Sequence, residues 1–408
     1  MAATPSFPAS SARRLADILA PDSNNFGLLR LLAALAVVVS HSVHLAGAPE
    51  SAEPLAAATG FSLGMHAVHM FFTVSGVLIA ASLARSASLW TYLEARALRL
   101  LPALIVCVLL TALVLGPLLS TQPLLAYFRA GGLWKYIGLT LGLITANAPL
   151  PGLFAHNPVP DIVNLPLWTL KYEAMCYFGL AVLGLAGLMR SPRLATLALV
   201  PLLLAWVAVA AFPEQLVVSG SMQSFLRLAF SFGLGTLAFV WRDRLILHWY
   251  GVAAALFAVA LLLGTPLQAP ATQVFVAYAT LWAASLPVGR LAALPRRDDL
   301  SYGVYIYDWV IAQSLLVVWP GLSQPVLLTA TLTLLLPVAA LSWFYIEKPA
   351  LGWKRARAAA PAPVATPTEP PPVPAFQIEG PARDRLARMS RQAAAAAPAR
   401  QEAIPAGL

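Results

Sequence analysis

The feature that most constrains the fold of this chain is a series of ten long apolar runs, because a helix of about 20 apolar residues crosses a hydrocarbon core of about 30 Å. Their approximate limits are 26–46, 61–84, 100–120, 168–189, 194–212, 223–241, 247–264, 270–288, 301–319 and 325–347. Charged residues make up 11% of the chain, against about 25% in soluble domains. The sequence therefore predicts an all-α, polytopic integral membrane protein with about ten transmembrane helices.

Basic residues are distributed unevenly among the loops that join these runs. With a cytoplasmic N-terminus, only Arg129 and Lys135 fall in outer loops. The inner loops hold Arg85, Arg96, Arg99, Arg190, Arg193, Arg242, Arg244, Arg290, Arg296 and Arg297. This positive-inside bias predicts an even number of spans and places both termini in the cytoplasm. The formal charge of +9 follows the same pattern and does not indicate a nucleic-acid surface.

The same patterns divide the chain into three parts. Residues 1–25 are expected to be a cytoplasmic segment, 26–350 the transmembrane domain, and 351–408 a disordered Ala- and Pro-rich cytoplasmic tail. Residues 133–146 are apolar but too short to cross comfortably, which favours a re-entrant or interfacial helix. The polar, proline-rich stretch 148–166 is expected to be an ordered outer loop where an acceptor docks.

Arg30 and His41 lie eleven residues apart on the first apolar run. On a helix this spacing returns to within about 20° of the same face, with a rise of roughly 16 Å. Because burying an ionisable group in a bilayer is costly, such groups are functional candidates by default. Two simpler interpretations stay open: a snorkelling Arg30 at the membrane boundary, and a His41 that makes an interhelical hydrogen bond.

Further polar residues begin or interrupt other runs. Arg96 and Arg99 share a helix face before Pro102. They are interpreted either as topology signals or as a clamp for phosphates at the inner surface. Glu173 lies about one and a half turns into its span, after Trp168, and needs a partner there. The ninth run opens with Tyr302, Tyr305 and Asp308, and the tenth ends with the string Glu347-Lys348-Pro349, which fits a helix stop.

Four histidines lie near the first outer loop, as His41 with His44 and His66 with His69. A metal or haem site is one interpretation of this group. No carboxylate or thiolate completes the set, so polar helix ends or contacts with an acceptor are favoured, and no metal is expected.

Several strings then occur in a characteristic order. They are NNFGLLRLLAALAVVVSHS with Arg30 and His41, HMFFTVSGVLIA, Arg96-Ala-Leu-Arg99, NLPLWTLKYEAMCYF with Glu173, SYGVYIY and IEKP. In this order and spacing the chain, over about residues 24–350, resembles transmembrane acyltransferase family 3, which includes O-acetylases of O-antigen and exopolysaccharide. Two positions depart from the common pattern: His69, where many members carry an acidic residue, and Asp308, where many carry a histidine.

The resemblance implies transfer of an acyl group, usually acetyl, from cytosolic acyl-CoA to a carbohydrate hydroxyl outside a bacterial inner membrane. It implies His41 as the catalytic residue, either as general base or as acyl carrier. The assignments that follow are Arg30 and Glu173 as further catalytic residues, Arg30, Arg96 and Arg99 for acyl-CoA, and Trp168, His69 and Tyr305 for the acceptor. Acetyl-CoA is expected as a substrate and not as a permanently bound cofactor.

Two other functions stay open. A transporter or flippase of a lipid-linked saccharide would place Arg30, His41 and Glu173 along its path. No pair of broken half-helices repeats across two halves of the chain, which favours the enzyme. An acyltransferase for a peptide or an antibiotic would keep the chemistry and change only the acceptor.

Overall fold

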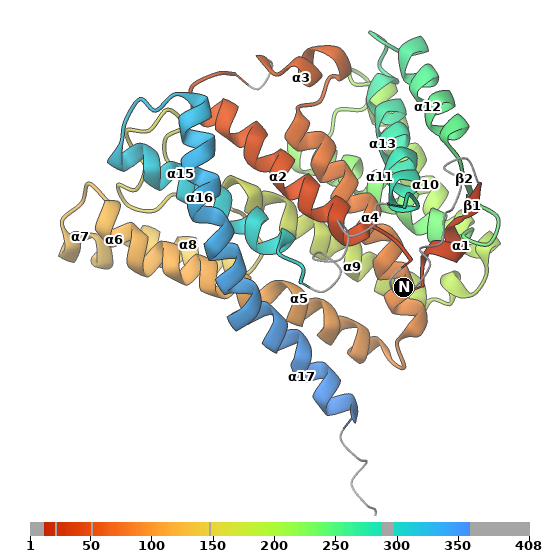
Figure 1. Ribbon diagram of the computed structural model, residues 1–408, viewed down its shortest axis with the longest axis horizontal. Helices are drawn as coiled ribbons and strands as arrows, with labels where there is room; N and C mark the ends of the chain where they lie inside the picture. Colours follow the sequence, from red (N-terminus) through yellow and green to blue (C-terminus); the bar gives the residue numbers. More distant parts are fainter. Residues whose placement is uncertain (1–11, 21–22, 50–51, 147, 288–297, 360–408) are drawn as a thin grey trace, which may run out of the picture. The chain divides into compact units, whose positions relative to one another are not determined.

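The computed structural model describes residues 12–20, 23–49, 52–146, 148–287 and 298–359, and this part of the chain is helical almost throughout (Figure 1). Two short strands, β1 (Arg13–Arg14) and β2 (Ile246–Leu247), pair antiparallel. The all-α prediction is thus confirmed. Residues 360–408, and with them most of the predicted tail, lie outside the described residues.

The helices alternate with short connections. In chain order they are α1 (Leu15–Ile18), α2 (Phe26–Leu45), α3 (Pro54–Thr59), α4 (Leu63–Arg85), α5 (Leu89–Leu110), η2 (Thr111–Leu115), α6 (Gly116–Leu119), α7 (Leu124–Arg129), α8 (Gly131–Leu141), η3 (Leu165–Thr169), α9 (Leu170–Leu185), η4 (Leu188–Arg190), α10 (Pro192–Ala211), α11 (Gly220–Val240), α12 (Trp249–Leu261), α13 (Gln268–Ala284), α15 (Ser301–Val318), α16 (Gln324–Ser342), η6 (Trp343–Glu347) and α17 (Lys348–Ala359).

Six helical stretches in the described part are long and apolar enough to cross a membrane. They are Phe26–Leu45, Leu63–Arg85, Leu89–Leu119, Pro192–Ala211, Gly220–Val240 and Gln324–Trp353. The other four predicted spans also form helices, but α9, α12 and α13 have 16, 13 and 17 residues. Helix α15 has 18 residues, several of them polar. The structure thus supports a multi-pass membrane protein, and the count of ten spans stays a prediction.

Serine residues start several of the long helices. Ser62, Ser88, Ser191 and Ser219 are the N-cap residues of α4, α5, α10 and α11, and each side-chain oxygen accepts a backbone N–H of the first turn. Such caps satisfy donors that have no partner within the helix. They define where these helices begin after each loop.

Helices α2 and α4 lie between α15 and α16 on one side and α11 and α13 on the other (Figure 1). Two glycines let α4 and α11 approach to backbone contact. A Cβ atom on Gly76 would overlap the carbonyl oxygen of Phe232, and one on Gly235 would overlap that of Thr73. Small residues at such crossings are typical of membrane helices, whose association depends on close packing.

Two predictions about helix ends can be compared with the structure. Helix α8 has eleven residues and is about 16 Å long, which is too short to cross the bilayer. This agrees with the prediction for residues 133–146. Glu347-Lys348-Pro349 does not stop the last helix, because α16, η6 and α17 are continuous to Ala359, nine residues into the range assigned to the tail. Both π-helical segments, η2 and η6, directly precede a proline-containing turn, at Pro117 and Pro349, where a backbone donor is missing.

The stretch 148–166 is held against α15 by amide and indole groups. The Asn157 side chain donates to Gln313, and Gln313 donates back to the carbonyl oxygens of Val159 and Ile162. Trp309 also donates to the Ile162 carbonyl oxygen, at 2.9 Å. These buried contacts give the loop a fixed position beside the middle of α15.

Candidate functional site

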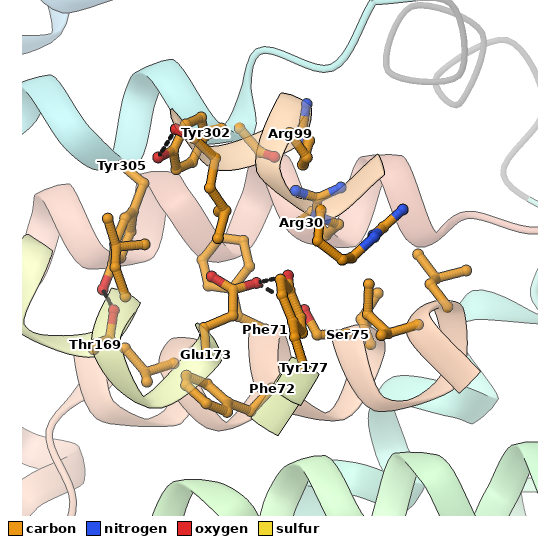
Figure 2. Close-up of a pocket in the computed structure, with 18 residues that line it drawn as sticks. Arg30, Phe71, Phe72, Ser75, Arg99, Thr169, Glu173, Tyr177, Tyr302 and Tyr305 are labelled. Carbon is orange, nitrogen blue, oxygen red and sulfur yellow. Dashed lines mark hydrogen bonds between the residues drawn. The ribbon is translucent and has the colours of Figure 1, made fainter. Parts of the chain in front are cut away.

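One cavity brings together residues from five helices and the short η3 segment. Its volume is about 740 Å³, including the solvent space at its mouth. The lining residues are Arg30, Val68, Phe71, Phe72, Val74, Ser75, Leu78, Ile79, Arg96, Arg99, Leu100, Thr169, Leu170, Glu173, Tyr177, Ser301, Tyr302 and Tyr305. Figure 2 shows Glu173 and Tyr177 between Arg30 and Arg99 on one side and Thr169 with Tyr305 on the other. The cavity thus has a cationic end, an acidic middle and a hydroxyl-lined end.

At the cationic end, one carboxylate bridges two arginines. Asp299 Oδ2 lies 2.7 Å from Arg30 Nη1 and 2.7 Å from Arg99 Nη2. Burial raises the pKa of Asp299, but Arg30, Arg99 and hydrogen bonds from Ser301 outweigh it and lower the pKa from 3.8 to about 2. Arg99 also lies 3.4 Å from Glu347 Oε2. This cluster therefore brings two guanidinium groups together with two carboxyl groups.

Arg96, the third arginine of the cavity, differs from the other two. It makes no hydrogen bond or ion pair with any residue that the structure describes, and its Nε atom is buried without a partner there. Its guanidinium lies 5.9 Å from the centroid of the Tyr177 ring. Its positive charge is therefore available to a ligand.

In the middle of the cavity, Glu173 is held by hydroxyl groups. Glu173 Oε1 accepts hydrogen bonds from the Tyr177 hydroxyl and, at 3.4 Å, from the Ser75 hydroxyl. Glu173 was predicted to need a partner within the membrane, and these two residues provide it. Glu173 was also predicted to be a catalytic residue, but the carboxylate that contacts His41 is a different one.

That carboxylate belongs to Asp308. Its Oδ2 atom lies 2.7 Å from His41 Nδ1, and its Oδ1 atom accepts the backbone N–H of Trp309 at 2.6 Å. Asp308 is 1% exposed, while the His41 side chain is 17% exposed and lies edge-on to the Trp309 ring. Asp308 thus fixes one ring nitrogen of His41 and leaves Nε2 for another partner.

The His41–Asp308 pair lies beyond the hydroxyl-lined end of the cavity. Neither residue lines the cavity, but Asp308 follows Tyr305 by one helical turn on α15. Tyr305 shares a 2.8 Å hydrogen bond with Thr169, and its ring packs edge-on against Phe71. Tyr305 is therefore the cavity residue nearest to the pair along α15.

Five of the predicted site residues share this cavity: Arg30, Arg96, Arg99, Glu173 and Tyr305. Trp168 and His69 do not line it. Trp168 packs against Tyr172, and His69 is fully buried with its ring 4.7 Å from Phe61. The predicted acceptor contacts of these two residues therefore have no support from the cavity.

Sequence reasoning gave no role to Asp308 and Asp299. Asp308 carried the right signal, because it is an ionisable residue within an apolar run, the criterion that singled out Glu173. It was seen only as a departure from the family pattern. Asp299 precedes its helix by two residues and looks like an ordinary loop residue, so no sequence signal marked it.

The comparison with known protein families identifies the family to which the chain belongs. The chain belongs to acyltransferase family 3, whose acyltransferase domain matches residues 23–347. It is 32% identical over 336 residues to an O-acetyl transferase of Shigella phage Sf6, covering 80% of this chain and 95% of that protein. It is 28% identical over 370 residues to nodulation protein 10 of Rhizobium leguminosarum bv. viciae, covering 80% and 93%. No solved structure matches the chain.

Proposed function

We propose that this protein is a membrane O-acyltransferase that moves an acetyl group from acetyl-CoA to a hydroxyl group of a carbohydrate. Membership of the acyltransferase family and similarity to a protein named O-acetyl transferase support the reaction class. The observation that carries the mechanism is the His41–Asp308 pair, which lies one helical turn beyond Tyr305, a wall residue of the arginine-lined cavity.

The pair has the parts of a general base. A carboxylate that accepts the Nδ1–H of an imidazole fixes the tautomer whose Nε2 takes up a proton, as in the serine-protease triad. Asp308 is placed to do this for His41. In the base mechanism, His41 Nε2 removes the proton of the acceptor hydroxyl, whose oxygen attacks the thioester carbonyl. The C–S bond then breaks, and the CoA sulfur takes the proton from the imidazolium.

The acyl-carrier mechanism uses the same residues in two steps. His41 Nε2 attacks the thioester first, and the C–S bond breaks to give a positively charged acyl-imidazolium and the CoA thiolate. The acceptor hydroxyl then attacks the acyl carbon, its proton passes to the CoA thiolate, and the acyl–nitrogen bond breaks to return the neutral ring. Asp308 stabilises the positively charged imidazole ring in either mechanism. Both mechanisms therefore predict the same loss of catalysis when Asp308 is replaced.

The cavity suits the donor. Acyl-CoA carries phosphates at one end of a thin pantetheine arm and a thioester at the other. Arg30 and His41 are separated along α2 by eleven residues, or roughly 16 Å, which is close to the extended length of that arm. Amide groups of the arm would meet Glu173 and the hydroxyl groups of the cavity wall.

The proposed orientation of the chain in the membrane follows from the direction that leads from Arg30 to His41 along α2. The Arg30–Asp299 contact lies near the start of both α2 and α15, and the His41–Asp308 contact lies further along both. The two helices therefore run parallel, and each enters the membrane at the end that holds Arg30 and Asp299. The positive-inside pattern puts that end at the cytoplasm, where acyl-CoA is made. The acceptor then approaches His41 from the outer side of a bacterial inner membrane, and both chain termini are cytoplasmic.

Acetyl transfer in a purified system tests the proposal. The protein in nanodiscs is incubated with acetyl-CoA labelled in the acetyl group and with O-antigen or exopolysaccharide fragments. The expected result is a labelled ester that is released by mild alkali. Movement of a lipid-linked saccharide across vesicles without any labelled ester would overturn the proposal in favour of a transporter.

A further inference from the structure

The three arginines of the cavity differ in their charge balance. Arg30 and Arg99 share the Asp299 carboxylate, and Arg99 also faces Glu347. Arg96 lines the same cavity but has no carboxylate partner among the described residues. The two arginines with partners are less available to an anion than the third.

The geometry of the Asp299 contacts explains this difference. One carboxylate oxygen takes a 2.7 Å hydrogen bond from each of Arg30 and Arg99, the short distance of a charge-assisted bond. An incoming phosphate would have to displace this carboxylate, which has a pKa lowered to about 2 and so keeps its charge at neutral pH. The displaced carboxylate would then repel the phosphate across the same small space.

The surroundings of Arg96 favour a ligand. Its Nε atom is buried and unpartnered in the described part of the chain, and such atoms in native structures usually have a partner. The nearest aromatic face, that of Tyr177, is 5.9 Å away and leaves the in-plane donors of the guanidinium free. An anion in the cavity would satisfy these donors without displacing any protein group.

On the basis of the proposed function, we infer that Arg96 is the residue of this cavity that binds the donor phosphate, whereas Arg30 and Arg99 are positioning residues held by Asp299. The phosphate in question is the pyrophosphate next to the pantetheine arm, because Arg96 lies in the wall of the cavity that the arm would occupy. A lipid phosphate has the same chemistry, and the test separates the two sources.

The experiment compares two donors in nanodiscs: acetyl-CoA and S-acetyl-pantetheine, which lacks every phosphate. The quantity measured is the ratio of kcat/KM for acetyl-CoA to kcat/KM for S-acetyl-pantetheine. Arg96→Gln should lower this ratio about 10- to 100-fold, the effect of losing a hydrogen bond to a charged group. Arg96→Lys should lower it less, since lysine keeps the charge but loses the bidentate geometry.

The partnered arginines and an exposed arginine serve as controls. Arg30→Gln and Arg99→Gln should leave the ratio within about threefold of the unmodified protein, whatever their effect on each separate rate. Arg190→Gln, at an exposed arginine outside this cavity, should change neither rate nor ratio. It controls for the general attraction of anionic donors to a basic surface.

Two results would overturn the inference. One is an unchanged ratio in both Arg96 variants, as expected if Arg96 binds a lipid phosphate or only packs against Tyr177. The other is a larger fall in the ratio for Arg30→Gln or Arg99→Gln than for Arg96→Gln.

Absence of acetyl transfer from either donor in the unmodified protein would instead count against the proposed function. In that case, binding of labelled CoA to the unmodified protein and to Arg96→Gln still tests the inference, which predicts a dissociation constant 10- to 100-fold higher for the variant.

Discussion

His41 Nδ1 lies 2.7 Å from Asp308 Oδ2, and this contact ties the first long helix of the chain to a helix that begins 260 residues later. A second link joins Arg30, eleven residues before His41 on α2, to Asp299, which lies nine residues before Asp308 and two before the start of α15. The two links hold α2 and α15 parallel and in register. The reactive imidazole and the cationic end of the cavity are therefore positioned by one pair of helices.

Replacing Asp308 should affect catalysis far more than donor binding. Asp308→Asn keeps the shape but removes the charge that orients His41 and stabilises its protonated form. We expect kcat for acetyl transfer to fall by about 10²- to 10⁴-fold, with KM for acetyl-CoA within a few-fold of its original value. The control is Asp243→Asn, at an exposed loop aspartate, which should leave both constants unchanged. A loss seen only in KM would argue against an orienting role.

Breaking the cluster at the cationic end should destabilise the fold. Asp299→Ala leaves two partly buried guanidinium groups without their shared carboxylate, which should lower the free energy of unfolding by about 3 kcal/mol. The double variant Arg99→Gln/Asp299→Asn should lose less than the sum of its two single variants, because the pair is coupled. Unfolding in mixed detergent micelles measures Asp299→Ala, the double variant and its two single variants. Strict additivity would show that the two side chains act independently.

The same carboxylate predicts a dependence of stability on acid. Since folding lowers the pKa of Asp299 from 3.8 to about 2, the folded state binds this proton less readily than the unfolded state. The resulting stabilisation, about 2 kcal/mol, is fully present above pH 4 and is lost as the pH falls toward 2. Asp299→Asn should lack this contribution, so its stability should differ most from that of the unmodified protein at pH 5 and least at pH 2.5. A difference that stays constant over this range would contradict the assignment.

The crossing of α4 and α11 should tolerate no side chain at Gly76. Gly76→Ala places a methyl group onto the backbone of Phe232 and Thr236, so the two helices must separate. We expect a loss of about 3 kcal/mol in the free energy of unfolding. Gly179→Ala is the matched control, because a Cβ atom there meets open space. Alanine favours the helix at that position and should be neutral or slightly stabilising.

The helical architecture could be predicted from the sequence because each helix is encoded locally, by an apolar run and a polar start. Arg30, Arg96, Arg99, Glu173 and Tyr305 were found for a related reason. Polar groups within or beside apolar runs are costly there, so each one indicates a function. The structure brings these five residues together at one cavity.

The pairings between helices could not be predicted in the same way. Which carboxylate meets His41 depends on the register of α2 against α15, and no local pattern encodes that register. Glu173 was assigned a catalytic role from the sequence and Asp308 was not, although both are acidic residues within apolar runs. Tertiary packing gives His41 to Asp308, and Glu173 to Tyr177 and Ser75. The ion pairs around Asp299 and Arg99 likewise exist only after four distant segments have assembled.

The most direct test of the central claim is the rate of acetyl transfer by His41→Gln under saturating acetyl-CoA and acceptor. The proposed mechanism predicts a fall in kcat of at least about 10³-fold, with unchanged protein abundance in the membrane and unchanged binding of labelled CoA. A kcat within a few-fold of that of the unmodified protein would contradict it and remove His41 from the reaction.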